Sequence, residues 1–216
     1  MKIRLLLSFL TLLFVGQLNA QDSEKSEDNK TEESSEEKKK DSKEKKYEDI
    51  VTDDAITDKG LFQVHQVDDK YYYEIPDSLF GREMLVVTRI AKTASGIGFG
   101  GGKQNTQVLR WEKRSKKVLL RVVSHQVVAA DSLPIHEAVV NSNFEPILYS
   151  FDIKTIGKDS TSTVIQVNKF LESDVKAIGF PASRRKTYKI SSLDKSRSFI
   201  ESIKSYPRSD EMRHVK

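Results

Sequence analysis

The fold is decided by the stretch from Leu85 to Val128, which reads LVVTRIA (85–91), SGIGFGGGK (95–103) and VLRWEKRSKKVLLRVVSHQVV (108–128). The first and third parts are rich in β-branched and aromatic residues, which fit the pleated surface of a sheet. The glycines between them interrupt that pattern. We therefore predict a sheet core that is interrupted by a glycine hinge.

Strand patterns extend to both sides of this core. The segment LFQVHQVDDKYYYEIP (61–76) alternates apolar and polar residues around Asp68-Asp69, which predicts a hairpin. Two further candidate strands lie at 147–156 and 163–170. If the chain is truncated and later strands are lost, we expect the sheet edge formed by these two strands to be exposed. The apolar run 118–130 predicts a strand that is buried on both faces in the middle of the sheet.

A single good helix signal occurs near the end of the chain. Ser192 or Asp194 can cap this helix, and Pro207 stops it. Three apolar residues share its face: Phe199, Ile200 and Ile203. The final residues, EMRHVK, look like the start of a strand, so we expect a truncated product. The predicted fold class is mainly β (α+β), an antiparallel sheet or sandwich with one or two short helices.

The N-terminal region has the features of an exported protein. Residues 1–20 place Lys2 and Arg4 before an apolar run that is too short to span a membrane, and they end in Leu-Asn-Ala. This predicts a signal peptide, with a periplasmic, cell-surface or secreted location. Residues 21–46 contain no large apolar residue, so we expect a disordered charged tether.

Composition excludes several classes of function. The rest of the chain has 26 basic and 22 acidic side chains, and a net charge of +4 over 170 residues does not indicate nucleic-acid binding. The sequence contains no cysteine, which rules out disulfides and thiolate metal sites. We predict no nucleic-acid partner and no membrane span.

The glycine-rich segment matches a nucleotide-binding pattern only superficially. Its glycines at 96, 98 and 101 have the G-x-G-x-x-G spacing, but the residues that follow are typical of a strand, whereas a dinucleotide site needs a helix there. A connection between strands is the simpler interpretation. The functional alternative is a flexible flap over a partner groove, formed by Gly96, Gly98, Gly100, Gly101 and Gly102.

No catalytic or metal-binding residue is predicted in this chain. His136-Glu137-Ala138-Val139-Val140 resembles a zinc motif, but valine stands where the second histidine is needed. No two of the four histidines have ligand spacing. We expect His65 on a solvated strand face and His125 in a hydrogen bond beside the central strand.

One basic cluster is a candidate binding patch for an anion or an acidic partner. It consists of Arg184, Arg185, Lys186 and Lys189. A basic run of this kind more often forms a solvated edge that discourages pairing between sheets. Both interpretations stay open at this point.

Several ordered blocks resemble a known family. They are KYEDIVTDDAITDKGLFQVHQVDDKYYYEIPDSLFGREMLVVTRIAKT with the glycine loop, QNTQVLRWEKR, NSNFEPILYSF and SLDKSRSFIESIKSYP. Together they resemble the N-terminal region of large exported bacterial zinc-dependent metallopeptidases. In that family two upstream domains of unknown function, here 47–96 and 103–216, precede a metzincin-like catalytic domain. The resemblance implies that the second domain is incomplete here.

The resemblance implies an accessory role, since the catalytic H-E-x-x-H-x-x-G-x-x-H motif is missing from this sequence. We expect a non-catalytic portion that packs against the downstream protease domain and supports or covers it. Zinc is implied for the full-length family member, and this chain is expected to hold no cofactor. A protein or peptide substrate is a further expected partner. The alternative is a free-standing cell-envelope binding protein for peptide or glycan.

Overall fold

The structure is a computed structural model that describes residues 45–96 and 98–216. The predicted signal peptide and all but the last two residues of the predicted tether lie outside the described residues. Strands are the main secondary structure of the described part, with three short α-helices, which confirms the predicted fold class. The strands are β1 (Ile56–Lys59), β2 (Gln63–Val67), β3 (Lys70–Pro76), β4 (Glu83–Arg89), β5 (Lys103–Lys113), β6 (Lys117–Val123), β7 (Ile147–Ile156), β8 (Ser162–Gln166), β9 (Phe199–Tyr206) and β10 (Ser209–Val215). The helices are α1 (His136–Ser142), α2 (Asn168–Leu171) and α3 (Ala182–Thr187), with short 3-10 turns η1 (Tyr47–Asp49), η2 (Asp77–Leu79), η3 (Lys176–Ile178) and η4 (Lys195–Arg197).

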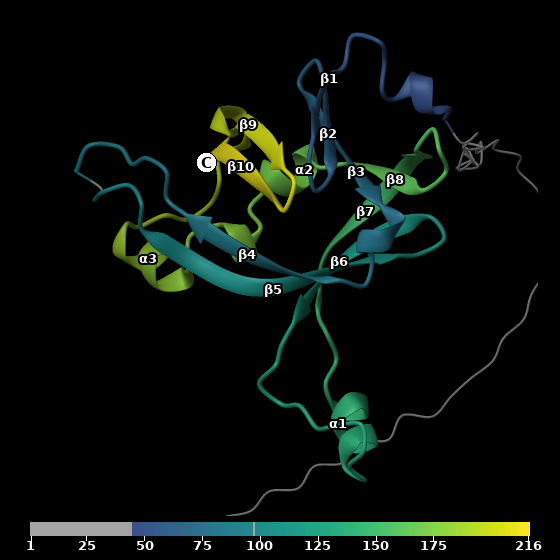
Figure 1. Ribbon diagram of the computed structural model, residues 1–216. Helices are drawn as coiled ribbons and strands as arrows, with labels where there is room; N and C mark the ends of the chain where they lie inside the picture. The colour runs from purple at the N-terminus through teal and green to yellow at the C-terminus, as the bar shows by residue number, and fades with distance from the viewer. Residues whose placement is uncertain (1–44, 97) are drawn as a thin grey trace, which may run out of the picture. The chain divides into compact units, whose positions relative to one another are not determined.

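Eight strands form one antiparallel sheet in the order β1-β2-β3-β8-β7-β6-β5-β4 (Figure 1). The first three strands lie at one end of this sheet, and β4 lies at the other end. The four strands that follow the glycine loop fill the space between them. The parts of the chain before and after the glycine loop therefore share one sheet and one core.

The main core lies on one face of this sheet. Trp111 and Phe151 pack with ring centroids 5.4 Å apart, and Phe151 also contacts Phe170 of α2. Side chains from η3 and from β9 complete the cluster, including Ile178, Ile200 and Ile203. A smaller cluster on the other face joins Ile50, Tyr72 and Val164, so the segment around η1 covers the back of β3 and β8.

The strands β9 and β10 form a separate hairpin beside the β1–β2 end of the sheet (yellow in Figure 1). Leu61 donates its backbone N–H to the carbonyl of Tyr206 at 2.7 Å. Ser205 donates its backbone N–H to Asp58 at 3.0 Å and its hydroxyl to the carbonyl of Phe62 at 2.8 Å. We call this contact between the hairpin and the sheet the Ser205 joint.

The C-terminal helix predicted over Phe199, Ile200 and Ile203 is wrong, because these residues form β9. Ile200 and Ile203 are three residues apart yet both are buried. The strand register explains this, since Ile200 pairs with His214 and Ser202 pairs with Arg213, which leaves Glu201 as an extra residue in a β-bulge. The bulge turns Ile200 and Ile203 to one face and imitates helical spacing, while Pro207 lies in the turn after β9.

Two further expectations about the sheet need correction. The apolar run predicted as a strand from 118 to 130 ends as β6 at Val123, and its buried residues Val118 and Leu120 lie on one face, whereas Leu119 and Arg121 are only half-buried. The predicted strands at 147–156 and 163–170 correspond to β7 and β8, which lie inside the sheet and not at an edge. The second prediction is too long, because β8 ends at Gln166 and the chain then forms α2. The predicted hairpin around Asp68-Asp69 is confirmed as β2 and β3, and the expected C-terminal strand as β10.

The connection between β6 and β7 forms a projecting arm, which we define as residues 124–147. Figure 1 shows it leaving the end of the sheet and carrying α1 away from the other strands. None of its side chains is buried. The backbone nevertheless has internal order, because His136 donates its N–H to Leu133 and Val139 donates to Ile135.

Candidate functional site

A buried polar network lies under η1, on the face of β2 and β3 opposite the main core. The Nε2 atom of His65 is 2.8 Å from Oε2 of Glu74, and its Nδ1 is 2.8 Å from the hydroxyl of Thr57. Tyr47 donates its hydroxyl to Glu74 at 2.8 Å, and Ser162 donates to the other carboxylate oxygen. His65 is only 2 % exposed, so its predicted place on a solvated strand face is wrong.

The network is electrostatically coupled. Burial by itself raises the pKa of Glu74, but hydrogen bonds from His65, Ser162 and Tyr47 outweigh it, and the pKa lies below its usual value. Burial and the Glu74 carboxylate together raise the pKa of the Tyr47 hydroxyl. Each member of the network has a partner, which is the condition under which buried polar groups rigidify a fold.

A cleft of about 290 Å³ opens beside this network. Its lining includes Thr57, His65 and Lys158. The hydroxyl of Thr57, the imidazole of His65 and the carboxylate of Glu74 form a chain of hydrogen bonds. Enzymes with a hydroxyl nucleophile use the same order of hydroxyl, base and orienting group. Here the imidazole is enclosed, and the contacts of Glu74 to Tyr47 and Ser162 hold η1 and β8 against the sheet. These contacts give the network a structural role.

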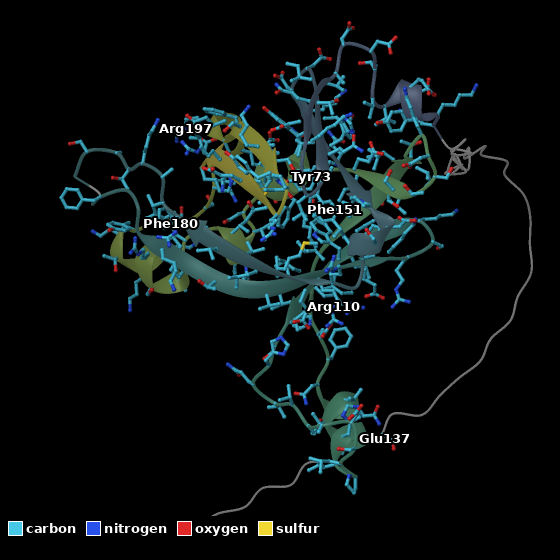
Figure 2. The ribbon with its side chains drawn as sticks, viewed as in Figure 1. Tyr73, Arg110, Glu137, Phe151, Phe180 and Arg197 are labelled. Atoms are coloured by element: carbon cyan, nitrogen blue, oxygen red, sulfur yellow. The ribbon has the colours of Figure 1, made fainter. Side chains whose placement is uncertain are left out.

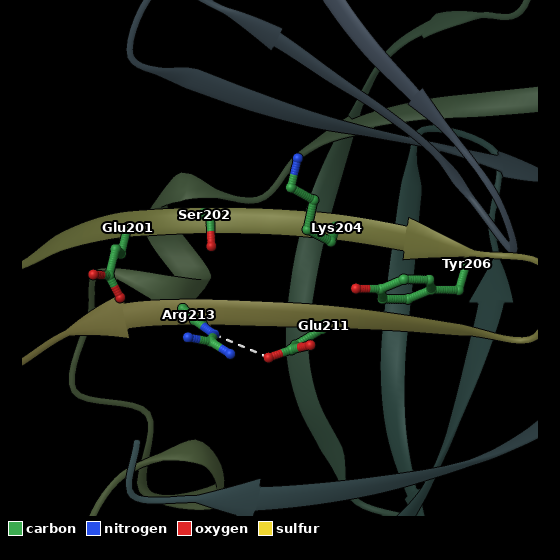
Figure 3. Close-up of a pocket in the computed structure, with 6 residues that line it drawn as sticks. All are labelled: Glu201, Ser202, Lys204, Tyr206, Glu211 and Arg213. Carbon is green, nitrogen blue, oxygen red and sulfur yellow. Dashed lines mark hydrogen bonds and ion pairs between the residues drawn. The ribbon is translucent and has the colours of Figure 1, made fainter. Parts of the chain in front are cut away.

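A second cleft, of about 330 Å³, lies on the β9–β10 hairpin. Figure 3 shows its lining side chains, which are Glu201, Ser202, Lys204, Tyr206, Glu211 and Arg213. Arg213 donates to Glu211 at 2.9 Å, so charges of both signs are already paired within the cleft. This arrangement favours no particular class of ligand.

The glycines of the predicted flap connect β4 to β5. Gly96, Gly98 and Gly101 have positive φ angles, which explains why the sequence needs glycine at these turns. Backbone hydrogen bonds between Ile90 and Gly101 and between Ile90 and Gly102 close the base of this loop. Between these turns Phe99 is 92 % exposed, so the loop presents one large aromatic side chain. The role of Gly96, Gly98, Gly100, Gly101 and Gly102 as a flap stays a prediction.

The predicted basic patch lies on α3 and the residues after it. Arg185 is already engaged, because its guanidinium donates to Asp174 and to the carbonyl of Phe180. The hydrogen bond from Arg185 lowers the pKa of Asp174. Lys186 and Lys189 are exposed, and Arg184 is half-buried. The structure thus leaves three cations of the cluster for a partner, and its binding role stays a prediction.

The arm carries the largest group of exposed apolar side chains in the described residues. They are Val127, Val128, Leu133, Ile135, Val140, Phe144 and Ile147. Phe144 is 76 % exposed although it stacks under Arg121, whose guanidinium lies 5.3 Å from the ring centroid. Sequence reasoning missed this surface, since Pro134 and two asparagines indicated only a loop. The available signal was the combination of apolar residues with no lysine or arginine between Arg121 and Lys154.

The base of the arm is fixed to the sheet by charged side chains. Arg110 forms an ion pair with Glu145, and Arg121 donates to the backbone carbonyl of Glu145 at 2.7 Å. Arg121 also pairs with Glu112 on the neighbouring strand. Figure 2 shows Arg110 at this base and Glu137 farther out on α1. The arm is therefore presented from a fixed point while its apolar side chains face solvent.

Neither a cluster of metal ligands nor a membrane-spanning helix occurs in the described residues. Residues 45–96 and 98–216 contain no group of three or more His, Cys, Asp or Glu side chains placed to hold a metal ion. His125 lies 3.0 Å from Glu83, as a single pair beside the sheet, and His136 binds the carbonyl of Ala129. Within the same residues no helix combines the length and apolarity needed to cross a bilayer.

Comparison with known proteins gave two family matches. Residues 101–216, more than half of the chain, match the family described as Domain of unknown function (DUF5117). Residues 44–93 match Domain of unknown function (DUF5118). No curated protein and no solved structure gave a significant match. Strands from both matched segments belong to the same eight-stranded sheet.

Proposed function

The chain belongs to the family described as Domain of unknown function (DUF5117), and we propose that it is the non-catalytic N-terminal portion of an exported zinc-dependent metallopeptidase. In this proposal the chain packs against the protease domain and supports or covers it. The proposal rests on the resemblance of the ordered sequence blocks described above. In the structure it is supported by one observation, the exposed apolar arm.

The arm has the composition of an interface core. Cores of protein interfaces are depleted in charged residues and enriched in apolar ones. Residues 122–153 contain no lysine or arginine, although the whole chain has 36 of them. Large exposed apolar patches of this kind mark interaction sites in soluble proteins. A protease domain with an apolar groove is the partner that fits this surface.

In this proposal zinc belongs to the downstream protease domain, as the resemblance implies. Residues 45–96 and 98–216 contain no group of three or more side chains placed to hold a metal ion. The glycine loop with Phe99 is a second element that can contact the protease or its peptide substrate. The contribution of the chain is then to position and shield, and not to transfer protons or electrons.

The first test is the intact mass and zinc content of the native exported protein. We expect a mass well above 24.6 kDa, the mass of this chain, together with bound zinc. A mass equal to that of the processed chain, without zinc, would contradict the proposal. That result would favour the alternative of a cell-envelope protein that binds peptide or glycan.

The second test changes the arm in the native protein. Replacing Val128 and Val140 by serine removes exposed apolar surface without disturbing a buried side chain. We expect faster limited proteolysis between the two regions and lower peptide turnover. The matched control is Ile56→Ser, which removes an equally exposed side chain on β1 and should leave both measurements unchanged. Equal behaviour of the arm variant and the control would refute the role of the arm.

A further inference from the structure

The outer edge of β4 is a second candidate interaction surface, distinct from the arm. This strand lies at the end of the eight-stranded sheet, and no described segment pairs with its outer edge. Its five central residues, 84–88, are uncharged. Leu85 is 68 % exposed and Val87 is 41 % exposed, both on the face opposite the core, while Met84 and Val86 pack towards the core.

Two other edge strands in the described part of the chain, β1 and β10, are protected in ways that β4 is not. Proteins protect exposed edges by keeping them short or by placing charges on them. The strand β1 has only four residues and includes Asp58 and Lys59. The strand β10 carries three charged side chains, Asp210, Glu211 and Arg213. A seven-residue edge with an apolar centre is an open template for another strand.

The charges at the two ends of β4 identify the strand that fits best. Glu83 begins the strand and Arg89 ends it. If two copies of β4 pair antiparallel about a twofold axis at Val86, Glu83 of each copy lies opposite Arg89 of the other. The same register places Leu85 opposite Val87 and Met84 opposite Thr88. It also keeps the core face of one sheet continuous with the core face of the other, since opposite residues share a face.

We propose that the β4 edge binds the same edge of a second copy of this chain in a symmetric, antiparallel dimer. Symmetric dimers require a self-complementary patch, and this register supplies apolar pairs in the centre and an ion pair at each end. Glu83 contacts His125 at 3.0 Å and Arg89 donates to Gly101 at 3.3 Å. A carboxylate accepts several hydrogen bonds and a guanidinium has five N–H groups, so both keep capacity for the partner copy.

Charge reversal at the two ends gives a specific test. In the full-length protein, E83R places two arginines opposite each other at both ends of the interface, and R89E places two glutamates there. Analytical ultracentrifugation over a concentration series should show a dimer for the wild type and a dissociation constant raised at least about tenfold for each variant. An equimolar mixture of E83R and R89E restores opposite charges at both ends. We expect the mixture to form a heterodimer, and the double variant E83R/R89E to form a homodimer like the wild type.

Two controls separate this dimer from other associations. Circular dichroism of each variant must match the wild type, which is expected because both end residues of β4 are exposed. The arm variant with Val128 and Val140 replaced by serine should dimerise normally, so failure of the proposed protease contact leaves this result unaffected. A wild type that stays monomeric up to about 1 mM would overturn the proposal. Variants that dissociate but do not recover on mixing would show that Glu83 and Arg89 do not face each other across the interface, and would overturn it as well.

Discussion

Replacing Asp210 by asparagine should stabilise the protein at neutral pH and not at acidic pH. Burial raises the pKa of the Asp210 carboxyl from 3.8 to about 6, although hydrogen bonds from Ser205 and from the backbone of Phe62 partly oppose the rise. The Ser205 hydroxyl contacts both the carbonyl of Phe62 and the carboxylate of Asp210, and its one proton can be donated to only one of them at a time. When that proton is donated to Phe62, the contact with Asp210 needs a proton on the carboxyl group, which acts in the same direction as burial.

The size of the effect follows from this shift. A raised folded-state pKa means that the folded protein binds the proton more tightly, so stability is highest below about pH 4 and falls as the pH rises towards about 6. Two pKa units correspond to about 3 kcal/mol, and the partial exposure of Asp210 reduces this to about 1 to 2 kcal/mol. Asparagine mimics the protonated acid and does not titrate. Its advantage over aspartate should therefore grow by about 1 to 2 kcal/mol between pH 4 and pH 7.

The assay is thermal unfolding of both proteins at pH 4, 5, 6, 7 and 8. For a domain of this size the expected gain at pH 7 is about 3 to 6 °C relative to pH 4. Titration of His214, whose pKa burial lowers to about 4, occurs in both proteins and cancels in the comparison. Asp54→Asn is the matched control, because Asp54 is exposed. If the difference in melting temperature between the wild type and Asp210→Asn does not change with pH, burial does not raise the pKa of Asp210 and the reasoning is refuted.

Three further variants test how the sheet is held together. Asn168→Ala removes the acceptor of the Tyr71 N–H at 2.7 Å and the donor to the Asp69 carbonyl at 2.8 Å. Urea unfolding should therefore show that the free energy of unfolding falls by about 2 to 4 kcal/mol. An effect near zero would disprove the bridging role of Asn168. Gly157→Ala places a methyl group against Ser162 and Glu74, so it should lower the melting temperature and reduce the free energy of unfolding by about 1 to 3 kcal/mol. Gly102→Ala is the control, because its methyl group has room and stability should hardly change. Ile165→Ala removes most of a fully buried side chain, so the free energy of unfolding should fall by about 2 to 5 kcal/mol while its dependence on denaturant stays the same. A smaller loss than that caused by truncating an exposed side chain would contradict the place of Ile165 in the core.

Local sequence patterns predicted most of the strands. Alternation around Asp68-Asp69 identified β2 and β3, and Asp68 indeed adopts a positive φ in that turn. Turn residues bounded β7 and separated it from β8. These features depend on neighbours in the chain, which is why they can be read locally. The order of strands in the sheet depends on pairing between distant residues, such as Tyr73 with Ile165, and no pattern within a short window specifies it.

The errors arose where a residue had a partner that the local pattern does not reveal. The burial of His65 follows from the η1 segment, which covers the second face of the sheet and brings Tyr47 against Glu74. The false helix over β9 follows from the bulge at Glu201, which depends on the register with β10. The arm was missed because apolar residues are normally assumed to be buried, whereas those of residues 124–147 are not.

The interleaving of the sheet also sets the order in which the chain can complete its fold during synthesis. The hairpin β2–β3 can form early, but the neighbour of β3 is β8, whose residues leave the ribosome about ninety positions later. Pairing between strands so far apart in sequence is slower than forming a local hairpin, and it must also wait until these residues have been synthesised. The N-terminal strands must therefore wait, partly exposed, until residue 166 has been made. Proteolytic sensitivity of nascent chains should fall sharply once β8 has emerged, and not when β4 has.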